Sequence, residues 1–167
     1  LSTYGELAVK IGLNLQPGQR LLILGPIANG GASLEAAPLA RKVAESAYRA
    51  GARYVEVLYR DDHLKRARVE HAPDDALDWS PPWTVALIDH MVETRGATIS
   101  ITGDAEPELL ADLDQRRAQR ARPRSAVEKL LDAENRRLIQ WTIVGYPNEG
   151  WARTVFGEPD VERLWDA

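Results

Sequence analysis

Histidine, aspartate and glutamate are the residues of this sequence that could bind a metal ion or catalyse proton transfer, because the chain contains no cysteine. The histidines are His63, His71 and His90, and none belongs to the H-E-x-x-H pattern that places two zinc ligands on one helical face. Asp61 and Asp62 precede His63, but neighbouring residues of a helix point about 100° apart and cannot all reach one metal. We therefore expect Asp61 and Asp62 to cap a helix, and we assign no metal ligand to this chain.

Serine is the remaining type of nucleophile, and no serine lies in the G-x-S-x-G pattern that presents a catalytic serine on a sharp turn. A dense run of arginines spans residues 116–124, but acidic residues surround it and no aromatic residue separates the arginines to stack on a base. A solvated helix face or a subunit contact is the expected role of this run. The sequence assigns no catalytic residue to this chain.

The segment Gly25–Ser33 is rich in glycine and follows a predicted strand, as phosphate-binding loops do. A loop of the Walker type requires a lysine after Gly30, where this sequence has Gly31. The G-x-G-x-x-G pattern of dinucleotide-binding proteins fails at Ile27. We interpret Gly25–Ser33 as a flexible connection. The alternative is a stand-alone nucleotide-binding or regulatory α/β module that uses this loop for its ligand.

Composition favours a single globular domain. The chain has 167 residues, of which 44% are hydrophobic and 28% are charged, and this length suffices for a substantial core. The net charge of −4 argues against a nucleic-acid partner. No apolar run approaches the roughly 18 residues that a membrane span requires, so we expect no membrane partner. The absence of cysteine and of a signal-peptide pattern favours a cytoplasmic protein.

Short apolar segments alternate with helical patterns along the chain. We predict strands at residues 21–24, 53–59, 97–102 and 139–144. Helices are expected at residues 7–13, 34–50, 62–71, 80–95, 107–113 and 115–137, and a further helix begins near residue 159. This alternation predicts an α/β fold: an open, mostly parallel sheet of about four to six strands with helices on both faces.

The C-terminal segment is rich in large aromatic residues, with Tyr146, Trp151 and Trp165 all following the last predicted strand. Such residues often anchor packing or an interface, and we predict that these three contact a further domain. The helical pattern reaches Ala167 without a stop signal, and the chain begins at Leu1 rather than at methionine. We therefore expect residues 1–167 to be a single α/β domain cut from a longer polypeptide.

Several segments, taken together and in order, resemble one enzyme family. They include Leu7–Gln19, Ala47–Ala52, Val57–Asp62, Ala97–Asp104, Trp141–Val144, Tyr146–Pro147, Gly150–Ala152 and Leu164–Ala167. The family is that of the thermophilic-type metallo-aminopeptidases, which comprises aminopeptidase T and aminopeptidase S. The resemblance covers nearly the whole chain.

This resemblance implies a parent enzyme of two domains that removes N-terminal residues from peptides and forms a homodimer. The present chain would be the N-terminal domain, which walls the catalytic cavity and supports assembly. A C-terminal catalytic domain, absent from this chain, would hold two divalent metal ions (Zn, Co or Mg), so we expect no metal in residues 1–167. By itself the chain is expected to be inactive.

Overall fold

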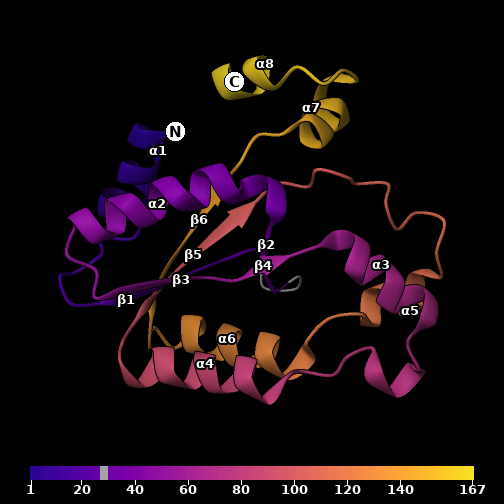
Figure 1. Ribbon diagram of the computed structural model, residues 1–167, viewed down its shortest axis with the longest axis horizontal. Helices are drawn as coiled ribbons and strands as arrows, with labels where there is room; N and C mark the ends of the chain where they lie inside the picture. The colour runs from indigo at the N-terminus through magenta and orange to yellow at the C-terminus, as the bar shows by residue number, and fades with distance from the viewer. Residues whose placement is uncertain (27–29) are drawn as a thin grey trace.

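A four-stranded parallel sheet forms the centre of the molecule (Figure 1). The computed structural model describes residues 1–26 and 30–167. The strand order is β3-β1-β5-β6, and every neighbouring pair is parallel. The strands are β1 (Arg20–Leu24), β3 (Tyr54–Val57), β5 (Ala97–Thr102) and β6 (Gln140–Gly145). The predicted α/β class and the predicted parallel sheet are both confirmed.

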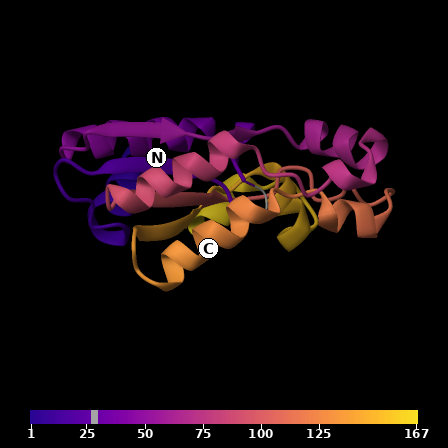
Figure 2. The same cartoon turned by 90° about the horizontal axis from the view of Figure 1, so that it is seen from below.

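Strand β1 is apolar because both of its faces are covered. Leu21 and Ile23 pack into the larger hydrophobic cluster on the side of helix α2 (Ala37–Arg49). Leu22 and Leu24 face the opposite way, toward α4 (Pro82–Glu93) and α6 (Arg124–Asn135). Figure 1 shows α2 on one side of the sheet and the pair α4–α6 on the other, and Figure 2 shows α4 beside α6. Helices on both faces were predicted, and this prediction is confirmed.

The N-terminal helix forms, but the residues that it buries differ from those predicted. It begins as α1 (Ser2–Leu7) and continues as the π-helix η1 (Ala8–Gly12). The backbone N–H of Leu13 bonds to the carbonyl of Ala8 at 2.9 Å, five residues earlier. This wider turn rotates the later residues, so Ala8 and Leu13 are buried while Leu7 and Ile11 are exposed. The predicted apolar stripe is therefore only half correct.

The helix predicted at residues 34–50 is confirmed with a tighter first turn. A short 3₁₀ turn, η3 (Leu34–Ala36), precedes α2, and Pro38 occupies the first turn of α2, where proline is tolerated. The predicted face of α2 is buried, with Leu39, Val43 and Ala47 fully covered. Each of the two larger side chains stabilises the fold by about 1.5–3 kcal/mol relative to an exposed position.

A second, two-stranded sheet lies beside the first, where β2 (Ala32–Ser33) pairs with β4 (Tyr59–Arg60). The prediction that the loop extends through Ser33 is therefore wrong. Both residues of β2 are buried, and the N–H of Ala32 bonds to the carbonyl of Leu58 at 2.8 Å. Their pairing partner is distant in sequence, which hides this strand from local patterns. The strand predicted at residues 53–59 is correspondingly divided into β3 and β4.

Helix α3 (Asp62–His71) follows β4 as predicted, and Asp61 is its cap. The Asp61 carboxylate accepts a hydrogen bond from the backbone N–H of His63 at 2.9 Å. The capping role assigned to Asp61 is confirmed. Asp62 is instead the first residue of α3, and its carboxylate pairs with Arg60 at 2.8 Å.

The helix predicted at residues 107–113 does not form. This segment consists of turns in which the N–H groups of Leu109, Ala111 and Leu113 each bond three residues back, as from Leu109 to Glu106 at 3.0 Å. Arg66 of α3 holds the segment, because its guanidinium bonds to the Leu109 carbonyl and pairs with Asp112 at 2.7 Å. The same guanidinium lowers the pKa of the Asp112 carboxyl to about 2. The first of these bonds occupies a backbone carbonyl that a helix would use, and the second fixes the segment against α3.

The helix predicted at residues 115–137 is divided into α5 (Gln115–Arg120) and α6. Pro123 lies between the two helices, and it has neither a backbone N–H nor a compatible ring position inside a continuous helix. Asp114 caps α5 through the N–H of Arg116 at 2.8 Å. The proline was visible in the sequence and is sufficient to explain the division.

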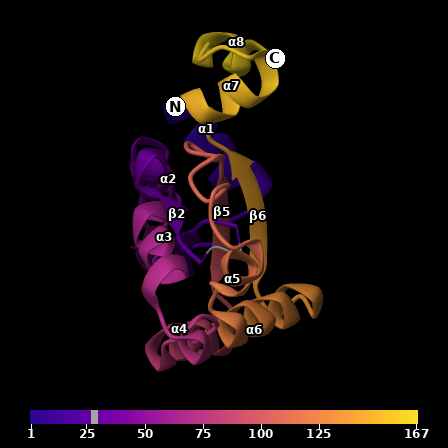
Figure 3. The ribbon, with the colours of Figure 1, turned by 90° about the vertical axis from the view of Figure 1, so that its right-hand side faces the viewer.

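The chain ends in two short helices, α7 (Glu149–Phe156) and α8 (Val161–Asp166). Asn148 caps α7 by accepting the Trp151 N–H at 2.9 Å, and Gly157 ends it in the left-handed region. Figures 1 and 3 show both helices beyond the sheet, on the side where α1 lies. The helix predicted near residue 159 is confirmed. Across the described residues, no helix has the length and apolar character needed to cross a membrane.

Glu134 of α6 allows a test of how this helix packs in the domain. Burial raises the pKa of its carboxyl, because desolvation disfavours the charged form. A raised folded-state pKa means that this group favours folding at low pH and that its contribution is lost as pH rises through that pKa.

We expect Glu134→Gln to raise the free energy of unfolding at pH 7 by less than about 1 kcal/mol, since the side chain is only partly buried. The gain should shrink below pH 4.5, where the carboxyl is protonated in both states. Urea unfolding at the two pH values measures both effects. Glu128→Gln, at an exposed position of the same helix, is the control and should give no such gain. Destabilisation by Glu134→Gln at pH 7 would contradict this account.

Candidate functional site

The carboxyl ends of β1 and β5 form the position where an open parallel sheet usually binds its ligand. Strand β3 lies on one side of β1 and strand β5 on the other, so the order of strands reverses between β1 and β5. Connections leaving the sheet at such a point diverge and create a crevice. Two connections leave the sheet here: one follows Leu24 at the end of β1, and the other follows Thr102 at the end of β5.

The described ends of the segment Gly25–Ser33 pack closely against strand β4 of the same chain. Residues 27–29, Ile27 included, lie outside the described part of the chain. A Cβ atom on Gly31 would lie 2.5 Å from the backbone carbonyl carbon of Tyr59, so no larger residue fits there. Arg60 donates a hydrogen bond from Nη1 to the Gly31 carbonyl at 2.8 Å. Close backbone packing therefore explains Gly31 without a phosphate ligand.

The exit from β5 and helix α7 enclose a surface pocket of about 330 Å³. Asp104 supplies a carboxylate, Trp151 supplies an indole ring, and the remaining lining residues are Thr102, Gly103, Pro107 and Thr154. Helix α7 approaches closely because Gly150 lacks a side chain: a Cβ there would lie 2.1 Å from the Ala105 carbonyl oxygen. A carboxylate beside an aromatic ring suits a cationic group. No local sequence pattern indicated that Asp104 and Thr154 line a pocket.

The predicted interface residues gather near this pocket. Trp165 is 42% exposed, and its ring meets that of Tyr146 edge to face at a centroid distance of 6.5 Å. Tyr4 of α1 joins them, with its ring 5.5 Å from Trp165 and its hydroxyl donating to the Gly145 carbonyl at 3.0 Å. Trp151 is half-buried beside Gly145. Sequence reasoning missed Tyr4, because it lies more than 140 residues away from its partners.

The histidines lie apart, each on the surface. His63 pairs with Glu106 at 2.9 Å and His71 with Glu70 at 3.4 Å, while His90 lies on the exposed side of α4. In residues 1–26 and 30–167, no group of three or more acidic or histidine side chains is arranged to hold a metal ion. The described residues therefore do not fit a metal centre.

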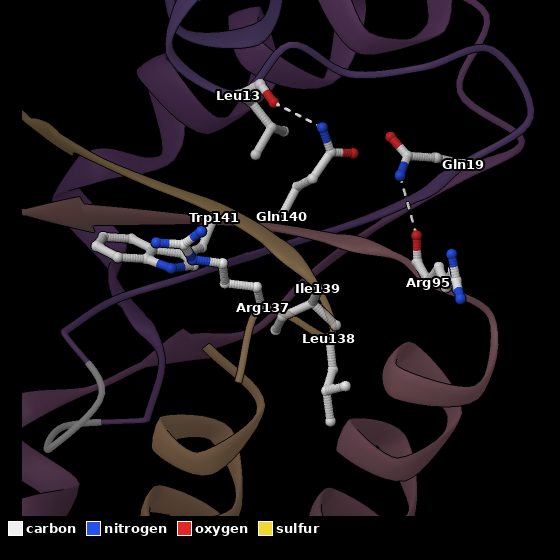
Figure 4. Close-up of a pocket in the computed structure, with 8 residues that line it drawn as sticks. All are labelled: Leu13, Gln19, Arg95, Arg137, Leu138, Ile139, Gln140 and Trp141. Carbon is white, nitrogen blue, oxygen red and sulfur yellow. Dashed lines mark hydrogen bonds between the residues drawn. The ribbon is translucent and has the colours of Figure 1, made fainter. Parts of the chain in front are cut away.

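A larger pocket, of about 560 Å³, opens at the opposite edge of the sheet (Figure 4). Arg95 and Arg137 contribute guanidinium groups, and Trp141 contributes its ring. The two glutamine amides of the lining already bond to backbone: Gln19 to the Arg95 carbonyl at 2.9 Å and Gln140 to the Leu13 carbonyl at 3.4 Å (Figure 4). The lining contains no carboxylate, histidine or serine that could act as a base or nucleophile. We therefore assign no catalytic role to this pocket.

Comparison with known proteins identifies the family. A family model described as thermophilic metalloprotease (M29) matches residues 1–167. The chain belongs to this family. Aminopeptidase T of Thermus thermophilus is 37% identical to this M29 chain and aminopeptidase 2 of Geobacillus stearothermophilus is 34% identical, each over the whole of it. The solved structure of wild-type AmpT from Thermus thermophilus superposes with a TM-score of 0.83 at 34% identity, covering 99% of this chain and 41% of that one.

The chain spans about 40% of the length of the curated relatives that it matches. The structural match confirms the α/β fold, and the matched relatives are aminopeptidases. The alternative of a stand-alone nucleotide-binding module finds no support in these comparisons.

Proposed function

We propose that this M29 chain is the N-terminal domain of a metal-dependent aminopeptidase that removes N-terminal residues from peptides. The observation that supports this most directly is the match to the family along residues 1–167, combined with relatives named aminopeptidase that are more than twice as long. The cytoplasmic location inferred from composition belongs to the same proposal.

The metal ions of this proposed enzyme would be held outside the residues described here. The family is one of metalloproteases, and bound divalent ions of the kind expected (Zn, Co or Mg) would polarise a peptide carbonyl. The described part of this chain offers no suitable set of ligands. Its proposed role is therefore to wall the catalytic cavity and to position the catalytic domain.

The proposed contact with the catalytic domain runs through Tyr146, Trp151 and Trp165. Trp165 is partly exposed although it is a large apolar side chain. Trp151 turns part of its ring toward the pocket between α7 and the exit from β5, which we call the carboxyl-edge pocket. A Trp side chain can bury about 150–250 Å² at an interface. This surface continues into the pocket lined by Asp104, so a domain docked here would enclose the pocket.

The first consequence concerns activity. We expect the purified 167-residue chain to show no metal-dependent hydrolysis of leucine p-nitroanilide when Co²⁺ or Zn²⁺ is added, because its described residues provide no metal ligands. A longer version of the protein that includes the catalytic domain should hydrolyse this substrate and should lose activity in EDTA. Clear metal-dependent turnover by the 167-residue chain would contradict the proposed division of roles.

The second consequence concerns the interface. Trp151→Ala should lower activity or assembly of the longer protein at least about tenfold, yet change the thermal midpoint of the 167-residue chain little. Trp165→Ala should behave in the same way. Trp83→Ala is the matched control, because Trp83 is 70% exposed on α4 and should affect neither measurement. A loss of about 3–5 kcal/mol from the 167-residue chain on Trp151→Ala would place this residue in the domain core instead.

The proposal also includes a homodimer. We propose that its two copies contact each other through strand β6. Strand β6 is at the edge of the sheet, and Trp141 and Ile143 on it are 47% and 57% exposed. Unpaired edge strands with apolar side chains tend to pair with another chain, and a twofold axis would make the contact self-complementary.

We expect Ile143→Lys to convert the dimer into a monomer, because it places a charge in the centre of this edge. Sedimentation equilibrium measures the change in mass. Leu64→Lys, at an exposed apolar position of α3 away from β6, is the control and should leave the mass unchanged. Retention of the dimer by Ile143→Lys would exclude β6 as the contact.

A further inference from the structure

Four arginines surround one surface pocket near the junction of α5 and α6. Arg116, Arg120, Arg122 and Arg124 line it together with Asp78 and Gln119, and its volume is about 350 Å³. The pocket therefore combines four guanidinium groups with a single carboxylate, although the chain as a whole has a net charge of −4. Figure 1 shows α5 beside α3, at the opposite end of the molecule from α1. The aminopeptidase proposal assigns no role to this pocket.

The side chains of two of these arginines make no polar contact with the described residues, and a third bonds only to an uncharged carbonyl. Arg120 donates to the Asp74 carbonyl at 2.5 Å, and Arg124 pairs with Glu128 at 2.9 Å. The side chains of Arg116 and Arg122 make no hydrogen bond or ion pair with any residue in 1–26 or 30–167. The Arg124–Glu128 pair is exposed on both sides, so it stabilises the fold little.

Like charges held around one depression repel one another, and an anion that bridges them removes this cost. The arginine guanidinium presents several N–H donors in a plane that match two oxygens of an oxyanion. Arg120 and Arg124 each use only part of their donor set within the protein, so they too can contribute. The pocket volume lies within the range of small-molecule sites.

We propose that this pocket binds a small molecule carrying a di- or triphosphate, with its phosphate oxygens between Arg116 and Arg122. A triphosphate concentrates several charged oxygens in a compact group, which matches four guanidiniums around one cavity. An acidic peptide brings only one carboxylate per residue and matches this arrangement less well. The site lies on α5 and α6 and is separate from the carboxyl-edge pocket of Asp104 and Trp151.

The test is calorimetric titration of the chain with inorganic tripolyphosphate at low ionic strength. Wild-type protein should bind it saturably at one site, and Arg116→Gln/Arg122→Gln should weaken binding by about tenfold or more. Both side chains are exposed and without protein partners, so circular dichroism and the thermal midpoint should be unchanged. The control is Arg153→Gln/Arg163→Gln on α7 and α8, which removes the same charge elsewhere and should change affinity less than about twofold.

Titrations with ATP and with citrate show which chemical group of the ligand the pocket binds. Equal affinity for ATP and tripolyphosphate assigns binding to the phosphates alone, and tighter binding of ATP supports a nucleotide as the ligand. Citrate or an acidic hexapeptide that binds as tightly as tripolyphosphate would overturn the assignment to phosphate. The proposal also fails if wild-type protein shows no saturable binding below about 1 mM, or if the two double variants weaken binding equally.

Discussion

Burial of both faces of strand β1 is the constraint on which the rest of this molecule depends. A parallel strand in the middle of a sheet must be covered on each side, and the alternate leucine and isoleucine side chains of β1 do this in opposite directions. Helix α2 must therefore pack on one face, and α4 and α6 on the other. Strands β3 and β5 pair with the two edges of β1, so the reversal of strand order, and with it the carboxyl-edge crevice, also follows from its central position.

The carboxyl-edge crevice is shaped mainly by close approach of backbone segments. Gly31 and Gly150 each face a backbone carbonyl group at a distance that leaves no space for a Cβ atom. These contacts draw the connection after β1 against β4, and they draw α7 against the exit of β5. Large aromatic rings from α1, from α8 and from Tyr146, which directly follows β6, then meet beyond the strand ends. The result is a closely packed surface of backbone and partly exposed aromatic rings, and this is the surface that we propose contacts a further domain.

Charge is distributed unevenly over this domain. Many ion pairs join residues three or four positions apart on one helix, and such exposed pairs stabilise a protein little. The Arg66–Asp112 pair is different, because it links α3 to a segment 46 residues away and replaces a helix with turns. Arg116 and Arg122 differ again. They line a shared pocket, and their side chains have no partner in the described chain.

Local sequence patterns were sufficient to predict the fold class, the four strands of the main sheet and most of the helices. These features depend on local periodicity, on caps such as Asp61 and on breakers such as Pro123, all of which act over a few residues. The sequence also led to the enzyme family, through segments distributed along the whole chain. The sequence could not reveal the rest, because the deciding partner lies far away in the chain.

Three features were decided by such distant partners. They are the two-stranded sheet of β2 and β4, the absence of a helix at residues 107–113 and the contacts of Tyr4. Each depends on contacts between residues at least 26 positions apart, which no local pattern records. The arginine run at residues 116–124 is a further example. Their number was evident from the sequence, whereas their convergence on one pocket was decided only when Pro123 turned the chain and brought Asp78 beside Arg124.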